Sequence, residues 1–257
     1  MIGLISLLFK MIFLCSAGFL AAFVDSIAGG GGLISLPAYL FAGVPPHFAL
    51  GTNKFASTSG SFLSTLGYAR SNKINFRLLR FAVPATVLGA ALGVRTVLLI
   101  PQDFLSPFVS VMILVVGLYT VFKKGIGEQN NFTTITRRKV LFGTLVGFTL
   151  GFYDGFFGPG TGSFLIFIFI RFFRYDFINA SGNAKLINFT SNITSLVMFA
   201  LNGKIDYAIG IPVALFMMAG STVGTRLAIR NGSKFIRPIF ITMSIAVFVK
   251  LVWQMTT

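Results

Sequence analysis

The sequence predicts an all-α protein that crosses a membrane several times. Hydrophobic residues make up 55% of its 257 residues and charged residues only 11%, and the mean hydropathy is +0.86. A soluble domain carries about 25% charged residues, because its surface faces water. Apolar runs of about 20 residues recur along the chain, which is the length of a membrane-spanning helix. Strands of a membrane β-barrel would instead alternate over about 10 residues, and the stretch 109–122 does not alternate.

The apolar segments form two sets of five. The first set comprises 4–28, 33–44, 50–69, 77–100 and 104–122, and the second comprises 139–157, 162–174, 182–202, 206–229 and 235–254. The second member of each set would be only about 20 Å long at 1.5 Å per residue, too short for a hydrocarbon core of about 30 Å. We therefore expect eight to ten helical segments, two of them half-helices that are either re-entrant or parts of broken spanning helices. Pro37, Pro84 and Pro212 are expected to kink their helices.

The two sets form an internal repeat. Asp25-x-x-x-Gly29-x-Gly31 recurs as Asp154-x-x-x-Gly158-x-Gly160, displaced by 129 positions. A second series is displaced by 131 positions: Lys54, Lys73, Gly89, Gly93 and Arg95 recur as Lys185, Lys204, Gly220, Gly224 and Arg226. This ordered series predicts two transmembrane repeats, residues 1–125 and 138–257, joined by a polar cytoplasmic linker at 126–137.

The net charge of +15 is unevenly distributed along the chain. Four regions, 70–80, 123–139, 171–174 and 226–237, hold most of the basic residues and alternate with loops of nearly zero charge. The positive-inside rule assigns all four to the cytoplasm and both chain ends to the opposite side. Of two loops at equivalent positions in the repeats, one is strongly basic and the other nearly neutral. This difference in charge predicts an inverted-topology repeat, a common plan of secondary transporters. A nucleic-acid surface is not expected, because its basic residues would lie on a soluble face.

The candidate substrate site begins at two glycine-rich breaks. The first is Gly29, Gly30, Gly31 and Gly32, and the second is Gly158, Gly160, Thr161 and Gly162 around Pro159. Non-helical backbone at membrane depth is tolerated where protein or a water-filled cavity surrounds it. Each short segment starts directly after its break, so its first amides and positive dipole end would attract an anion. The alternative is close helix packing through small residues.

Two lysines and two aspartates complete the candidate site. Lys54 and Lys185 begin apolar helices, each near an asparagine, Asn53 or Asn183, and are expected to face a shared cavity. The alternative is that both ammonium groups extend to the membrane surface. Asp25 and Asp154 end the first and sixth segments. They would exchange protons, hold the lysines until protonated, or cap the glycine breaks.

Other chemistry is not indicated. His47, the only histidine, follows two prolines and is expected to be a solvated loop side chain, and Cys15 is the only cysteine. No metal or cofactor is expected, because no second ligand accompanies either residue. The sequence lacks the nucleophile elbow, the zinc-protease motif and the phosphate-binding loop, so we expect no enzyme.

The first half resembles the TauE/SafE family of sulfite and organosulfonate exporters, through Asp25 to Gly32, Pro37 and Gly43 to Lys54. The stretch Gly155 to Gly162 is similar to the second-half signature of that family. The resemblance implies a carrier of the bacterial inner membrane, coupled to the proton gradient. Carried over by position, it implies substrate-site roles for Thr52, Asn53 and Lys54 and for Asn183 and Lys185. The second half departs from the motif, because Ala184 separates its asparagine from its lysine.

The repeat and the candidate site predict a secondary transporter that moves a small anion by alternating access. The resemblance implies that the anion contains sulfur and crosses the inner membrane. Three alternatives stay open: a passive anion channel, a carrier of another small organic anion, and a membrane-embedded accessory protein without transport. The expected partners are the small anion and membrane lipid, with no nucleic acid, and a homodimer stays open. The sequence does not decide which anion moves, in which direction, or with which coupling ion.

Overall fold

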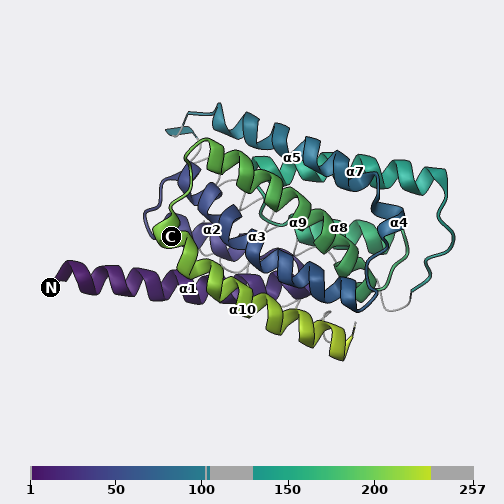
Figure 1. Cartoon of the computed structure of the whole chain (residues 1–257), viewed down its shortest axis with the longest axis horizontal. Helices are drawn as coiled ribbons and strands as arrows, with labels where there is room; N and C mark the ends of the chain where they lie inside the picture. The colour runs from purple at the N-terminus through teal and green to yellow at the C-terminus, as the bar shows by residue number, and fades with distance from the viewer. Residues whose placement is uncertain (1, 102, 105–129, 233–257) are drawn as a thin grey trace, which may run out of the picture.

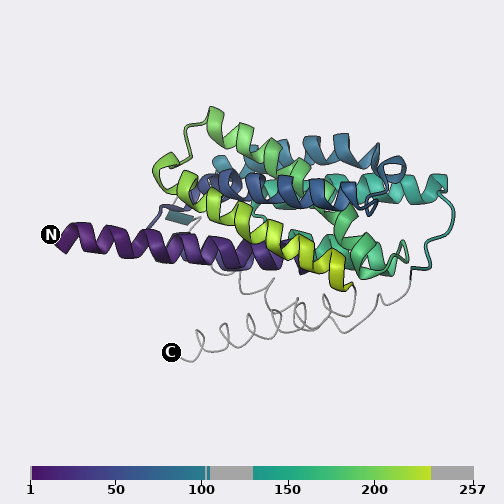
Figure 2. The same cartoon turned by 60° about the horizontal axis from the view of Figure 1, so that its bottom comes forward.

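The computed structural model of the chain describes residues 2–101, 103–104 and 130–232, with side chains from Leu7 onward. This part is a bundle of nine α-helices without a β-strand (Figure 1 and Figure 2). The helices are α1 (Ile2–Ala28), α2 (Gly32–Phe41), α3 (Pro46–Arg70), α4 (Phe76–Leu79), α5 (Ala82–Leu98), α7 (Arg137–Phe156), α8 (Thr161–Arg171), α9 (Phe177–Leu201) and α10 (Tyr207–Asn231). The predicted segments 104–122 and 235–254 lie outside the described residues.

The predicted all-helical fold is confirmed, with two differences in detail. The segment predicted at 77–100 consists of the short helix α4 followed by α5. Pro84 lies in the first turn of α5, where a helix needs no amide donor, so the predicted kink has no physical cause there. Pro37 and Pro212 lie inside α2 and α10 as expected. The two predicted half-helices are α2 and α8, with 10 and 11 residues.

Four of the described helices, α4, α7, α9 and α10, begin at a short polar side chain that caps them. Asp176 accepts a hydrogen bond from the amide of Asn179 at 2.7 Å, and Asp206 accepts one from the amide of Ile209 at 3.1 Å. Thr136 and Asn75 cap α7 and α4 in the same way. An N-cap oxygen satisfies one of the amides that the first turn leaves without an acceptor. Two of the few acidic residues are therefore used as caps.

The distribution of side chains is the reverse of that in a soluble protein. Large apolar side chains are exposed along the outer helices, for example Phe9 at 74%, Leu88 at 63% and Leu215 at 61%. Serine, threonine, asparagine, lysine and aspartate side chains are buried in the interior. Three described helices, Leu7–Ala28, Phe177–Leu201 and Tyr207–Asn231, are long and apolar enough to cross a membrane. An apolar exterior of this extent needs lipid around it.

Glycines bring a helix of one repeat into close contact with a helix of the other repeat, in two equivalent pairs. A Cβ atom added at Gly89 of α5 would lie 2.2 Å from the carbonyl oxygen of Phe148 in α7, and one added at Gly220 of α10 would lie 2.2 Å from that of Phe19 in α1. Glycine is required at such crossings, because any side chain would separate the backbones. Each helix pair joins one repeat to the other, so the two repeats share their packing surfaces.

The helices α3 and α9 lie side by side in opposite directions (Figure 1). Gly51 near the start of α3 contacts the carbonyl group of Lys204 just beyond α9. Reciprocally, Gly182 near the start of α9 contacts the carbonyl group of Lys73 just beyond α3. The loops that contain Lys73 and Lys204 therefore lie at opposite ends of this helix pair. The inverted arrangement of the repeats in the membrane stays a prediction.

The described members of the four basic regions gather at one end of the molecule. This end, at the right of Figure 1, contains the last turns of α3, α8 and α10 and the start of α7. Asn131 in the linker donates from its amide to the carbonyl oxygen of Arg174, and Asn75 donates to the hydroxyl of Tyr175. The charge pattern along the sequence thus becomes a basic end in space. That this end faces the cytoplasm stays a prediction.

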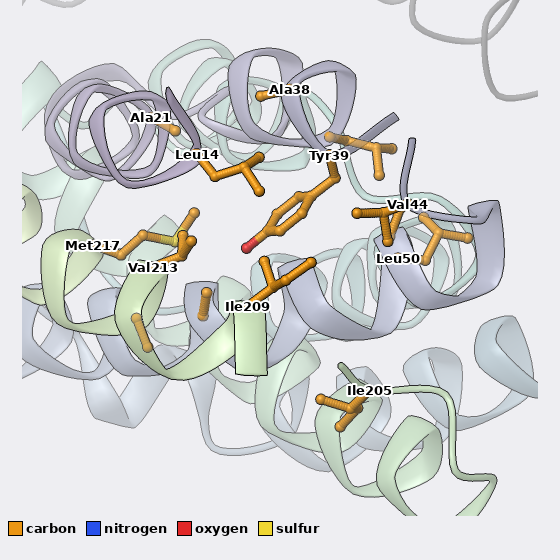
Figure 3. Packing of buried hydrophobic residues seen from close by; sticks show 14 of the residues in the cluster. Leu14, Ala21, Ala38, Tyr39, Val44, Leu50, Ile205, Ile209, Val213 and Met217 are labelled. Atoms are coloured by element: carbon orange, nitrogen blue, oxygen red, sulfur yellow. The ribbon is translucent and has the colours of Figure 1, made fainter. Parts of the chain in front are cut away.

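Two apolar clusters fill the bundle, one around α2 and one around α8. Figure 3 shows the first, with the ring of Tyr39 in α2 lying between Leu14 of α1 and Ile209 and Val213 of α10. The hydroxyl of Tyr39 is buried there without a hydrogen bond to any described residue. The clusters hold the two short helices, and the polar interior lies where their first turns meet.

Candidate functional site

The two glycine-rich breaks meet inside the bundle. The backbone of Gly29 packs directly on that of Gly162, and Gly32 packs on Pro159. Gly29, Gly30, Gly158 and Gly160 have positive φ angles between 73° and 99°, which residues with a Cβ adopt only with strain. The hydroxyl of Tyr153 donates to the carbonyl oxygen of Pro159 at 2.6 Å and holds the second break. The break sequences thus serve both close packing and the cavity described next.

A cavity of about 40 Å³ lies beside the breaks. One water molecule needs roughly 10–15 Å³ on this measure, so the cavity suits a ligand of a few heavy atoms. Nine predicted substrate-site residues line it: Gly30, Gly31, Gly32, Asn53, Lys54, Gly158, Gly160, Thr161 and Gly162. Both proton-coupling candidates, Asp25 and Asp154, line it as well. The first turns of α2 and α8 both open onto this space.

Each lysine forms an ion pair with the aspartate of the other repeat. Nζ of Lys54 lies 2.7 Å from Oδ2 of Asp154, and Lys185 pairs with Asp25. The lysines are 3% and 1% exposed, so neither ammonium group reaches the membrane surface. The pairs sit at repeat-equivalent positions and carry no net charge together. They join the two halves, and three of their four charged side chains, those of Lys54, Asp154 and Lys185, are buried.

The two ion pairs differ in their surroundings. Asp154 also accepts a hydrogen bond from Ser191, and Lys54 donates to Oδ1 of Asn192 at 3.0 Å. The positions equivalent to Ser191 and Asn192 are occupied by Gly60 and Ser61. The side chain of Asp154 is 2% exposed, whereas that of Asp25 is 25% exposed. The carboxylate of Asp25 is therefore the more exposed of the two aspartates, whereas Lys54 and not Lys185 lines the cavity.

Asp25 combines two of the roles predicted for it. Its Oδ2 atom pairs with Lys185, and its Oδ1 atom accepts a hydrogen bond from the amide of Gly31 at 3.2 Å. The carboxylate thus holds a lysine and the first glycine break together. A change in its charge would act on both.

Four predicted substrate-site residues do not line the cavity: Gly29, Thr52, Asn183 and Lys185. Thr52 accepts a hydrogen bond from the amide of Asp206 at 2.9 Å, and Asn183 accepts one from the amide of Asn75 at 2.8 Å. The two contacts occupy equivalent positions in the repeats. Thr52 of α3 holds the loop that follows α9, and Asn183 of α9 holds the loop that follows α3. Thr52 and Asn183 therefore act as supports of the loops in the described structure.

Sequence reasoning missed several polar residues of the cavity. Ser57 and Ser61 follow Lys54 at the third and seventh positions, and Asn188 and Asn192 line the cavity from the equivalent positions after Lys185. Residues at this spacing share one helix face. A polar stripe in phase with each lysine, present in both repeats, was the signal that would have identified them.

The remaining candidates lie elsewhere. His47 is buried rather than solvated, and its Nε2 atom lies 3.1 Å from the carbonyl oxygen of Val97. The expectation of a solvated loop side chain was wrong, because Pro45 caps α3, Pro46 begins it, and His47 in the first turn contacts Val97 of α5. Arg95 and Arg226, the arginines that recur in the two repeats, are exposed. No group of three potential metal ligands occurs among the residues that the structure describes.

Comparisons with known proteins decide the family. The sequence profile described as Sulfite exporter TauE/SafE matches residues 14–251. The chain belongs to the TauE/SafE family. It is 37% identical over 237 residues to a probable membrane transporter protein of Haemophilus influenzae, covering 92% of each chain. It is 34% identical to the probable membrane transporter protein YfcA of Escherichia coli K12, covering 91% of this chain and 87% of the relative.

A more distant relative is the probable membrane transporter protein YunE of Bacillus subtilis, 22% identical over 245 residues. No solved structure matches the chain significantly. Membership of the TauE/SafE family and the apolar exterior make the protein a membrane-embedded transporter. The resemblance found in the sequence motifs is confirmed over nearly the whole chain.

Proposed function

We propose that the protein is a secondary carrier of a small sulfur-containing anion, such as a sulfonate or sulfite, in a bacterial inner membrane. The two ion pairs that link the repeats, Lys54 with Asp154 and Lys185 with Asp25, carry this proposal. Family membership supports the class of substrate, because the family is described as sulfite exporters. The cavity beside the pairs suits an anion of a few heavy atoms.

The balance of charge in the cavity supports coupling to protons. Two lysines and two aspartates leave the site neutral, and an unpaired anion added to a buried neutral site is costly. A proton added to an aspartate removes one negative charge and releases a lysine. An anion and a proton therefore bind together at a lower cost than the anion alone. Asp25 is the proposed proton site, because its carboxylate is the more exposed one.

Binding would use groups already in place. The ammonium group of Lys54, which lines the cavity, and the first amides of α2 and α8 are the proposed donors for sulfonate or sulfite oxygens. Hydrogen bonds to charged groups are the stronger ones. Exposure of the cavity to alternate sides would follow from relative motion of the two repeats, which meet at the glycine breaks. A channel would not require the anion and the proton to move together.

The test is flux into proteoliposomes that contain the purified protein. A labelled sulfonate is used as the anion, because its own charge stays constant over the pH range and any pH effect belongs to the protein. We expect saturable uptake that an imposed pH gradient drives and that sulfite inhibits. In Asp25→Asn, uptake of the labelled sulfonate should persist at a reduced rate, and the imposed pH gradient should no longer change it. Asp103→Asn, at an exposed acid outside the cavity, is the matched control.

Three results would count against the proposal. Large currents that ignore the gradient would identify a channel. Saturable uptake of small carboxylates but not of sulfonates or sulfite would identify a carrier of another anion. A gradient response in Asp25→Asn equal to that of the parent would remove Asp25 as the proton site.

A further inference from the structure

A second cavity of about 770 Å³ lies at the basic end of the molecule. It shares no lining residue with the cavity beside the ion pairs. Figure 1 shows its elements, α4 and the first turns of α7, at the right of the bundle. Its walls include three arginines, Arg77, Arg80 and Arg137, and three large apolar side chains, Phe81, Val140 and Leu141. We call it the arginine groove.

The fold directs the arginines into this groove. In α4, Leu78 and Leu79 are buried in the core, which leaves Arg77 and Arg80 on the outside. In α7, Arg137, Val140 and Leu141 are spaced by three and four residues, so they share one helix face. The groove therefore has a cationic mouth beside an apolar wall.

The cationic mouth has no anionic partner in the described part of the chain. None of the three arginines forms an ion pair there, and no acidic residue lines the groove. The guanidinium group of Arg80 lies 4.7 Å from the ring centre of Phe81, which fixes one side of the mouth. Guanidinium groups bind phosphate through paired hydrogen bonds. The chemistry of the groove thus fits a phosphate group attached to an apolar body.

The apolar wall continues along the outside of α7. Leu141, Leu145 and Phe148 are 72%, 57% and 38% exposed and follow one another at helical spacing away from the arginines. An acyl chain lying along the helix would cover this stripe while its headgroup met the arginines. Basic pockets between membrane helices bind anionic lipid headgroups in this way. We propose that the arginine groove is a specific site for an anionic phospholipid.

The test uses purified protein in detergent, with thermal unfolding and native mass spectrometry as readouts. We expect cardiolipin and phosphatidylglycerol to raise the unfolding temperature and to remain bound. Phosphatidylethanolamine and inorganic phosphate should do neither. The triple variant Arg77→Gln, Arg80→Gln and Arg137→Gln should bind cardiolipin about 100-fold more weakly, since each basic residue contributes roughly a fivefold step in affinity.

The matched control removes the same charge outside the groove, with Arg95→Gln, Arg226→Gln and Arg230→Gln, and should bind like the parent. Leu141→Gln keeps every charge and should weaken cardiolipin binding through the apolar wall. An equal loss in both triple variants would reduce the effect to net charge and overturn the site. Equal stabilisation by inorganic phosphate, or equal binding of phosphatidylethanolamine, would overturn the lipid assignment.

Discussion

At the scale of single residues, the buried charges carry both stability and the proposed mechanism. Lys54 and Asp154 lie in the interior at 3% and 2% exposure, and Ser191 and Asn192 complete their hydrogen bonds. A buried ion pair is expensive to form and more expensive to break from one side, because the remaining charge stays unpaired. A variant that lacks one lysine can therefore lose transport because it is unstable, so its stability must be measured together with its transport.

A double variant separates these two effects. Lys54→Met leaves Asp154 buried without its partner, and we expect a loss of about 3–5 kcal/mol in stability. Lys54→Met combined with Asp154→Leu removes both charges and should recover most of that loss. Transport should be absent from both variants, because the donor of the site is missing. Thermal unfolding and sulfonate flux are the two measurements.

Lys204→Met is the control for this pair, since Lys204 is half-buried in a loop over the ring of Phe48 and outside the cavity. It should unfold and transport like the parent. If Lys54→Met were as stable as the parent, the ion pair would not be the buried contact described here. Transport by the double variant would remove Lys54 from the substrate site.

At the scale of elements, glycines decide how closely the helices approach. Gly89 and Gly93 of α5 lie against the backbone of α7, and Gly220 and Gly224 of α10 lie against that of α1. The contacted carbonyl groups, those of Phe148 and Phe19 for the first glycine of each pair, are themselves repeat-equivalent. The same packing device therefore operates twice in the molecule.

Alanine substitutions measure how much these close glycine contacts contribute to stability. Gly89→Ala places a Cβ atom 2.2 Å from a backbone oxygen, and we expect a loss of about 1–3 kcal/mol because α5 and α7 must separate. Gly220→Ala should cost a similar amount at the contact of α10 with α1. The measurement is the unfolding temperature of each variant in the same detergent.

Gly143→Ala in α7 is the matched control. Its added Cβ atom would meet only the ring of Phe173, at 3.6 Å, and alanine is the better helix former. It should be as stable as the parent or slightly more so. A Gly89→Ala variant that behaves like Gly143→Ala would mean that α5 and α7 do not cross as closely as described.

At the scale of the whole molecule, the gathering of basic residues at one end of the bundle implies an orientation in the membrane. Lys73 and Lys204 follow α3 and α9 at opposite ends of an antiparallel helix pair. The loop with Lys73 lies at the basic end, beside the arginine groove. By the positive-inside rule, that end should face the cytoplasm.

Cysteine labelling in sealed vesicles tests this orientation. On a Cys15→Ala background, Lys73→Cys should react only from the cytoplasmic side and Lys204→Cys only from the other side. A membrane-impermeant maleimide supplies the readout, and labelling after the vesicles are opened is the control for reactivity. Reaction of both positions from one side would contradict the inverted repeat.

Much of the fold could be predicted, because it depends on local properties of the chain. Apolar run length defines a spanning helix in lipid, and glycine runs mark where such a helix must break. The repeat spacing of Asp25 and Lys54 with Asp154 and Lys185 was also visible in the residues themselves. Helix existence, the two short helices and the membrane class were therefore all within reach of the sequence.

The partners of the charged residues were decided only by the tertiary structure. Lys54 pairs with Asp154, 100 positions away, and Lys185 with Asp25, 160 positions away. Thr52 and Asn183 sit beside the lysines in the chain, yet they hold distant loops. A helix turns neighbouring residues onto different faces, and only the packing of the other helices determines what each face meets. The sequence by itself determined which segments are apolar enough to lie in lipid and which charged residues recur in the two repeats. The packing of the two repeats against each other decided which of these residues share a cavity.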